Sequence, residues 1–413
     1  MSMTSVFMAK LPLFGNRKYS LEADKMMDVW LVAALILLLA IGLVMVSSAS
    51  MHISERTFGQ PWYYTIRQAA FMAMGLVAAL IVLRIPLVAW ERLGPMLLIC
   101  GMVLLVMVLI PGVGRKINGA ARWINLGIFN LQVSELIKLF VVVYMAGYLV
   151  RRGDEIRNTV KGFLKPMAVL GLVAALLLME PDFGATSVML MTAMGMLFIG
   201  GVRLWQFGVL IAVVASAMAA LAITSPYRMQ RLTTFLDPWA DPWASGFQLT
   251  QALIAIGRGE IWGVGLGSGV QKLFYLPEAH TDFLFSVMAE EFGLVGAVVV
   301  IGLFVTLVVR AFIIGARAEK LGAYFSGYVA YGLGLWLGLQ AFINIGVNMG
   351  VLPTKGLTLP LMSYGGSSIV VTCMAAALLL RIDHEVRSSS RQADQRSRQP
   401  DLRKDALTLR VRT

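Results

Sequence analysis

Long apolar stretches recur along this chain of 413 residues, and they constrain its fold more than any other feature. A membrane-spanning helix needs roughly 20 mainly apolar residues. The chain is 58% hydrophobic and 14% charged, whereas a soluble domain is about half apolar and about one quarter charged. The sequence therefore predicts an all-α polytopic membrane protein with ten transmembrane helices, near residues 28–48, 66–84, 94–111, 132–150, 165–179, 183–201, 205–224, 284–309, 322–345 and 361–381.

Basic residues cluster in alternate loops, and this bias predicts the topology. Cytoplasmic loops of membrane proteins carry an excess of lysine and arginine. One set of alternate loops, together with the C-terminal tail, holds most of them here, namely Arg84, Arg92, Arg151, Arg152, Arg157, Lys161, Lys165, Arg203, Arg310, Arg317 and Lys320. We therefore expect both termini in the cytoplasm. Because the net charge of +12 lies largely in these loops and tails, it does not indicate nucleic-acid binding.

The same pattern predicts one domain with two appendages. Residues 1–27 form a polar to mixed N-terminal extension on the cytoplasmic side, and residues 28–382 form a ten-helix membrane domain. The tail, residues 383–413, is basic and rich in Arg, Ser and Gln, so we expect it to be disordered. A large outer loop, residues 225–283, joins helices 7 and 8 and holds much of the polar chemistry.

Three titratable side chains end that loop, within the sequence Pro-Glu-Ala-His-Thr-Asp-Phe at residues 277–283. A carboxylate that is partly shielded from water has a raised pKa and is suited to take a proton from a hydroxyl group. Asp282 is therefore the candidate general base, with Glu278 beside it. The alternative for Asp282 is a helix cap, since Asp is a favoured N-cap residue. His280 either shares the chemistry or orients the loop.

An ionisable pair, Glu135 and Lys138, lies one turn apart inside the predicted fourth helix. Side chains at this spacing share a helix face and can form an ion pair. One interpretation is a buried pair that fixes helix packing. The other is a polar patch on a substrate cavity, because ionisable residues within membranes are usually functional.

Further cations are predicted on the outer side, against the charge bias. Arg115, Lys116 and Arg122 lie between helices 3 and 4. Arg122 precedes a tryptophan, which is typical of interfacial anchoring, but its guanidinium group also suits a phosphate. Lys355 belongs to an irregular segment rich in Gly, Pro and hydroxyl residues that leads into the last helix. Such backbone at membrane depth must be buried in protein or line a cavity.

Six motifs occur in one order along residues 28–382, and they resemble those of the SEDS family (shape, elongation, division, sporulation). They are Gly119-Ala-Ala-Arg-Trp-Ile, Val133-Ser-Glu-Leu-Ile-Lys, Glu180-Pro-Asp-Phe-Gly, Pro226-Tyr-Arg, Leu276-Pro-Glu-Ala-His-Thr-Asp and Ser363-Tyr-Gly-Gly-Ser-Ser. The residues around 272–280 and 354–360 are most similar to the division branch of the family.

This resemblance implies an inner-membrane peptidoglycan glycosyltransferase that polymerises lipid II at the division septum. By the resemblance, Asp282 is the catalytic aspartate and Glu135 and Lys138 are the polar pair of the fourth helix. Candidate substrate-binding residues are Arg115, Arg122, Glu135, Lys138, Glu278, His280, Lys355 and Ser367. The implied partners are a class B penicillin-binding protein and other membrane proteins of the division complex. The residues indicate no metal site, although a divalent cation stays open as a cofactor.

Two other functions remain as alternatives. A lipid II flippase also needs polar residues within the membrane, and it predicts a polar track that continues to the cytoplasmic face. The strong polar groups gather instead on the outer half. A scaffold without catalytic activity leaves the clustered ionisable residues unexplained.

Overall fold

The computed structural model describes residues 27–117, 120–125, 127, 130–223, 234–244, 246–273, 276, 278–353 and 356–398. Within these residues, eight helices are long and apolar enough to cross a membrane. They are α2 (Val29–Phe58), α3 (Tyr63–Arg84), α4 (Leu87–Leu109), α5 (Val133–Asn158), α6 (Val160–Met179), α11 (Leu284–Lys320), α12 (Tyr324–Asn348) and α13 (Gly366–Arg398). Two further apolar helices, α7 (Phe183–Ile199) and α8 (Leu204–Ile223), stand beside them. These ten match the ten predicted stretches in order, which confirms the polytopic all-α fold.

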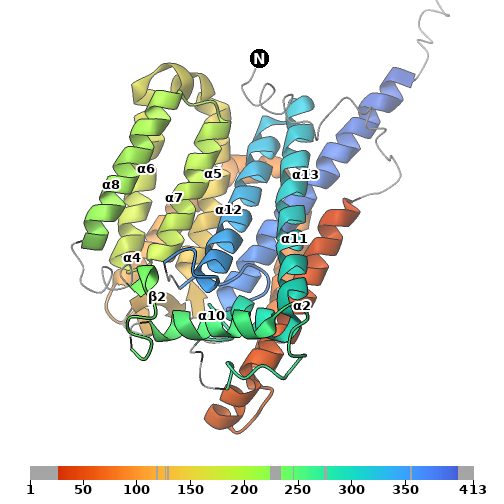
Figure 1. The fold of residues 1–413 in the computed structure, drawn as a ribbon. Helices are drawn as coiled ribbons and strands as arrows, with labels where there is room; N and C mark the ends of the chain where they lie inside the picture. Colours follow the sequence, from red (N-terminus) through yellow and green to blue (C-terminus); the bar gives the residue numbers. More distant parts are fainter. Residues whose placement is uncertain are drawn as a thin grey trace, which may run out of the picture.

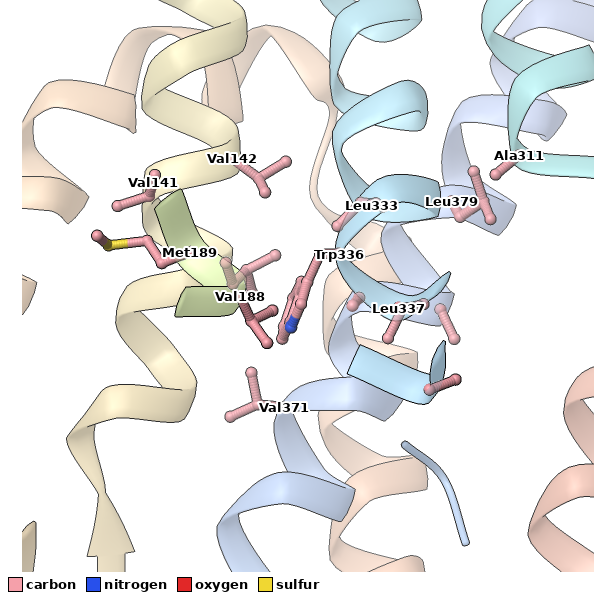
Figure 2. Packing of buried hydrophobic residues seen from close by; sticks show 14 of the residues in the cluster. Val141, Val142, Val188, Met189, Ala311, Leu333, Trp336, Leu337, Val371 and Leu379 are labelled. Carbon is pink, nitrogen blue, oxygen red and sulfur yellow. The ribbon is translucent and has the colours of Figure 1, made fainter. Parts of the chain in front are cut away.

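The ten helices run side by side in a bundle (Figure 1). Buried apolar side chains pack together in its core. The indole of Trp336 on α12 is fully buried. It lies against Val188 of α7 and close to Val371 of α13 (Figure 2). Helices α5 and α12 are the most enclosed elements, because most of the side chains on both are buried. Polar side chains on these two helices are therefore held away from water.

The lower end of the bundle in Figure 1 carries the only helix of the described residues that lies across the others, α10 (Phe247–Gly259). We call this the site end, and the opposite end the basic end. Sequence analysis did not predict α10. A Cβ atom at Gly259 would lie 1.9 Å from the carbonyl oxygen of Ala289 on α11. Only glycine therefore permits this approach of α10 to α11.

Helix α11 is broken at Gly293, near the site end. The backbone there has φ 64° and ψ −162°, a conformation that side chains other than hydrogen disfavour. The N–H groups of Leu294 and Val295 donate to the carbonyls of Glu260 and Ile261, just after α10. The break sets apart a short first piece, residues 284–292, which begins two residues after Asp282.

A small antiparallel sheet lies between α4 and α5 and was not predicted. Its strands are β1 (Gly114–Ile117), β2 (Ala120–Asn125) and β3 (Asn130–Gln132), in the order β1-β2-β3. The register places Arg115 opposite Trp123. The strands are three to six residues long, so their alternation of apolar and polar residues is too short to recognise in the sequence between two membrane helices.

The C-terminal tail departs from its prediction. Helix α13 continues to Arg398, and Asp383 and Val386 are buried. Disorder therefore does not begin at residue 383, because this part of the tail packs against the bundle. Residues 399–413, and residues 1–26 of the predicted extension 1–27, lie outside the described residues.

Candidate functional site

One buried face of α12 carries three amide side chains at intervals of four residues, Gln340, Asn344 and Asn348. Residues four apart lie above one another on a helix, so the three amides form a stripe along the helix toward the site end. Buried amides need hydrogen-bond partners, and between them these three bind α5, the start of α11 and the segment that leads into α13. The stripe therefore determines which segments meet at the site.

The polar pair of α5, Glu135 and Lys138, lies at the Gln340 end of this stripe, which we call the inner end. Lys138 Nζ donates to Glu135 Oε1 over 2.8 Å and to Gln340 Oε1 over 2.7 Å. The lysine is 1% exposed and stands 5.3 Å from the ring centre of Trp336. The second carboxylate oxygen, Glu135 Oε2, has no hydrogen-bond partner. The pair thus joins α5 to α12 through Gln340, and it leaves one buried acceptor without a hydrogen-bond partner.

Asp282 lies at the opposite, outer end of the same stripe, beside Asn348. Its backbone carbonyl accepts from Asn344 Nδ2 and Asn348 Nδ2, each over 2.9 Å. Helix α11 begins at Leu284 with Phe283 as its N-cap. The N–H of Ser286 is bound by Asn348 Oδ1, so a neighbouring helix supplies this part of the cap. The partly buried Asp282 side chain precedes the N-cap position that the alternative prediction assigned to it.

The irregular segment that leads into α13 contacts Gln340 and Asn344 of the stripe and also passes beside Asp282. Leu357 and Thr358 offer backbone carbonyls to Asn344 Nδ2, over 2.5 Å, and to Gln340 Nε2, over 3.0 Å. A Cβ atom at Gly356 would stand 3.2 Å from Asp282 Oδ2. The irregular segment therefore passes beside the candidate base and continues toward the buried pair, as expected for backbone that lines a site.

His280 and Glu278 occupy different environments. His280 is buried, with its ring 4.6 Å from that of Tyr64 and 5.5 Å from that of Tyr364. Burial lowers the pKa of His280 because it disfavours the charged imidazolium. The backbone carbonyl of His280 accepts from the N–H of Tyr364 over 2.9 Å. Glu278 is exposed and binds the hydroxyl of Thr281 over 2.7 Å. These contacts favour His280 as a residue that orients the loop.

The remaining predicted binding residues are more scattered. Arg122 donates to the carbonyls of Glu180, over 3.1 Å, and Pro181, over 2.6 Å, so it ties β2 to the turn between α6 and α7. Arg115 is exposed on β1. The hydroxyl of Ser367 accepts from the N–H of Gln132 and donates to the carbonyl of Asn130. Ser367 thus joins α13 to β3, and Lys355 lies outside the described residues.

Three residues near the site were missed by sequence reasoning. Gln340 bridges the buried pair to Thr358, but a single amide in an apolar helix gives little signal. Glu180 lies in a quoted motif, and both its carboxylate oxygens are buried without partners. Burial, with a contribution from Asp182, raises the pKa of Glu180 to about 8. Arg67 lies at the start of the second apolar stretch, where an arginine is typical of the boundary between a membrane helix and a loop.

Metal ligands are not gathered at this site. Over the parts of the chain that the structure describes, no group of three or more His, Cys, Asp or Glu side chains is placed to hold a metal ion.

Comparison with known proteins gives a family match over most of the chain. The model of a family described as "Cell cycle protein", which covers FtsW, RodA and SpoVE, matches residues 29–388. A protein of Nitrosococcus halophilus named "Probable peptidoglycan glycosyltransferase FtsW" is 60% identical over 360 residues, which are 87% of this chain and 93% of the relative. A Coxiella burnetii protein of the same name is 54% identical over 358 residues, 87% of this chain and 96% of the relative.

Solved structures show the same fold. A chain from a structure described as "Structural coordination of polymerization and crosslinking by a peptidoglycan synthase complex" aligns with a TM-score of 0.71 and 30% identity, over 87% of this chain and 98% of that one. The rod shape determining protein RodA of Thermus thermophilus aligns with a TM-score of 0.65 and 29% identity, over 87% and 97% of the two chains.

Proposed function

This chain belongs to the SEDS family of FtsW, RodA and SpoVE cell cycle proteins, and from that premise we propose that it polymerises lipid II with Asp282 as the general base. It is a peptidoglycan glycosyltransferase and a multi-pass membrane protein. The observation that carries the role of Asp282 is its position. It ends a buried polar stripe that connects it to Lys138 and Glu135, at the end of the bundle where α10 lies.

The reaction joins two lipid-linked sugars. The 4-hydroxyl of the acceptor sugar attacks the anomeric carbon of the donor, the bond to the lipid diphosphate breaks, and the configuration at that carbon inverts. The carboxylate of Asp282 takes the proton from the attacking hydroxyl. Negative charge develops on the leaving diphosphate, and fixed cations near it stabilise the transition state.

Lys138 and Glu135 have a supporting place in this proposal. Lys138 is buried and already bound to Glu135 and Gln340. It supplies a fixed positive charge behind the stripe, and Glu135 keeps its free oxygen for a donor on the substrate. Arg122, held by the turn after α6, and Arg115 on β1 add positive charge at the site end.

The cellular setting completes the proposal. The structural neighbour named for polymerisation and crosslinking supports a crosslinking partner of the class B penicillin-binding type. The names of the relatives support a place among the division proteins at the septum. The basic residues gathered at the end opposite α10 support cytoplasmic termini. We propose residues 28–382 as the catalytic membrane domain, with α13 continuing beyond its end to Arg398.

The test is polymerisation of labelled lipid II by the purified protein with its penicillin-binding partner. Asp282→Asn keeps the size of the side chain but removes the base, so we expect glycan strands to fall by a factor of about 1,000 or more. Asp237→Asn is the matched control, because Asp237 is an exposed carboxylate in the same outer loop. The control should polymerise like the wild type.

Two outcomes would contradict the proposal. If Asp282→Asn polymerises at the wild-type rate, Asp282 is not the base. If the wild type binds lipid II and carries it between the leaflets of a vesicle without polymerising it, the flippase alternative replaces the transferase. Thermal unfolding of each variant establishes that equal amounts of folded protein are compared.

A further inference from the structure

One arginine at the site end, Arg67, has aromatic rings beside it and, among the described residues, no carboxylate partner. Arg67 is partly buried on α3, one turn after the helix begins at Tyr63. Its Nη1 donates a hydrogen bond to the hydroxyl of Tyr63, over 2.7 Å. Its guanidinium carbon lies 5.5 Å from the ring centre of Tyr63 and 5.8 Å from that of Phe71. No carboxylate of the described residues forms an ion pair with it.

The position of Arg67 on α3 brings it to the site. Tyr64, Arg67, Gln68 and Phe71 follow one another at helical spacing, so they share one face. Tyr64 packs against His280 and Tyr364, and Phe71 packs against Tyr364. This face therefore meets both the loop that carries Asp282 and the segment that leads into α13.

The same face is also short of hydrogen-bond partners. Gln68 is fully buried, and its Nε2 binds the carbonyl of Ser363 over 3.3 Å while its Oε1 has no partner. A guanidinium group offers five N–H donors, and one of those of Arg67 is used. A partly desolvated charge without a counter-ion is costly, so a bound anion at this place would be favourable.

We propose that Arg67 binds the phosphate groups of the lipid-linked substrate through its planar guanidinium fork. Tyr63 and Phe71 hold the fork against their rings, next to the loop of Asp282. A lipid diphosphate suits the place, because its charge lies where the apolar tail meets the sugars and Arg67 lies one turn inside a membrane helix. This inference rests on the proposed function, and it adds a substrate contact that the motifs did not predict.

The experiment measures KM and kcat for lipid II in vesicles of phosphatidylcholine alone. Arg67→Gln should raise KM by about tenfold to a hundredfold, because a hydrogen bond to a charged group is lost, with a smaller change in kcat. Arg67→Lys should recover part of the loss, since lysine keeps the charge without the fork. Arg56→Gln is the matched control, an exposed arginine at the same end of the bundle, and its KM should equal that of the wild type.

A binding measurement separates this inference from the proposed function. In the Asp282→Asn background, which does not turn over, Arg67→Gln should weaken binding of undecaprenyl diphosphate and of lipid II by the same factor. Equal binding with and without Arg67 overturns the inference, even if the wild type polymerises. If the wild type makes no glycan, the proposed function fails while weaker binding by Arg67→Gln still supports the phosphate contact.

Two further outcomes decide the source of the phosphate and the effect of folding. A KM change that appears only when phosphatidylglycerol is added assigns Arg67 to a lipid headgroup and overturns the substrate contact.

If Arg67→Gln does not fold, Tyr63→Phe takes its place, because it removes the hydroxyl that orients Arg67 and leaves the rings. Tyr63→Phe should raise KM by about threefold to tenfold, and an unchanged KM overturns the inference.

Discussion

The two ends of the bundle both hold buried charges, but at the basic end the buried carboxylates are paired with arginines. Asp28, which caps α2, binds Arg310 of α11 and Arg387 of α13. Arg387 also binds Asp383 over 2.8 Å, and the N–H of Asp28 donates to Asp383 over 2.8 Å. The two acids are 1% and 0% exposed. Two carboxylates face two guanidinium groups in this quartet, which ties three helices together. A third arginine, Arg317, lies near them with its Nη1 buried and without a hydrogen-bond partner.

At the site end the charges are incompletely matched. Glu135 keeps one buried oxygen without a partner, and Glu180 keeps two. Arg67 is bound to a tyrosine hydroxyl, and Arg122 is bound to backbone carbonyls. Structural charges tend to be paired, whereas functional sites retain unbalanced ones. The site end also holds a buried ion pair, Lys272–Glu291, so the two ends differ in the carboxylate oxygens of Glu135 and Glu180 that stay unpartnered. We infer that these unpartnered oxygens mark residues offered to a substrate, whereas the paired quartet holds the fold.

The sharpest way to test this comparison is to break the quartet. Asp28→Ala leaves Arg310 and Arg387 without their shared carboxylate. Removing one partner of a buried ion pair costs about 3–5 kcal/mol, so we expect the Tm to fall strongly. The specific activity of the protein that remains folded should stay near that of the wild type. Thermal unfolding followed by tryptophan fluorescence, with polymerisation assayed below the transition, measures both. Normal Tm with lost activity would contradict the division between the two ends.

The opposite result is expected for the pair on α5. The double variant Glu135→Gln, Lys138→Met removes both charges and keeps similar volumes. Replacing a buried ion pair by neutral residues is often neutral or stabilising, so the Tm should be unchanged or higher. Polymerisation should fall about 100-fold, which corresponds to about 2.7 kcal/mol. A large loss of Tm together with full specific activity would show that this pair serves packing alone.

Much of this fold was predictable because hydrophobic length is a strong signal. The ten apolar stretches and the helices agree in order, and Asp282, Glu135 and Lys138 meet through one helix face. The sequence could not show α10, since it is amphipathic and too short to span a membrane. The sequence also did not predict the small sheet, because its strands are only three to six residues long. The tail was predicted to be disordered from its composition, but Asp383 pairs with Arg387 and packs within the bundle.

The site was harder to predict than the fold, because contacts between distant segments decide it. Gln340 and Asn344 become important only when α12 packs beside α5 and the segment leading into α13. Arg122 stood among outer-side cations as a candidate phosphate ligand, yet two of its nitrogens bind carbonyls of the turn after α6. Arg67 looked like a boundary residue until Tyr64 and Phe71 placed its helix face against the loop of Asp282.

The unpaired acid Glu180 gives a pH-dependent version of the comparison. Its pKa is raised to about 8 in the folded protein by burial and by Asp182, from an ordinary value of 4.5. The folded state therefore holds a proton that the unfolded chain releases above pH 4.5. Stability is full below that pH and falls as the pH rises toward 8. Between pKa values of 4.5 and about 8 the loss comes to about 5 kcal/mol.

Glu180→Gln removes this titration, since glutamine stays neutral at every pH. We expect the variant to have a higher Tm than the wild type at pH 8.5 and a similar Tm near pH 4.5. Thermal unfolding across pH 4.5 to 9 measures the difference. Glu278→Gln, at an exposed position of the same end, is the control and should follow the wild-type profile. Parallel profiles for Glu180→Gln and the wild type would mean that the acid is ionised in the folded state.

The smallest effect is expected where charges are paired but exposed. Glu155 binds Arg152 and Lys165 near the junction of α5 and α6, and the three side chains are 36%, 53% and 58% exposed. Ion pairs in water contribute little, because solvent screens them and long side chains lose entropy. Glu155→Gln should therefore leave both the Tm and the polymerisation rate unchanged within experimental error. A Tm loss comparable to that of Asp28→Ala would show that pairing stabilises this bundle without burial, and the contrast between the two ends would then reflect the number of pairs.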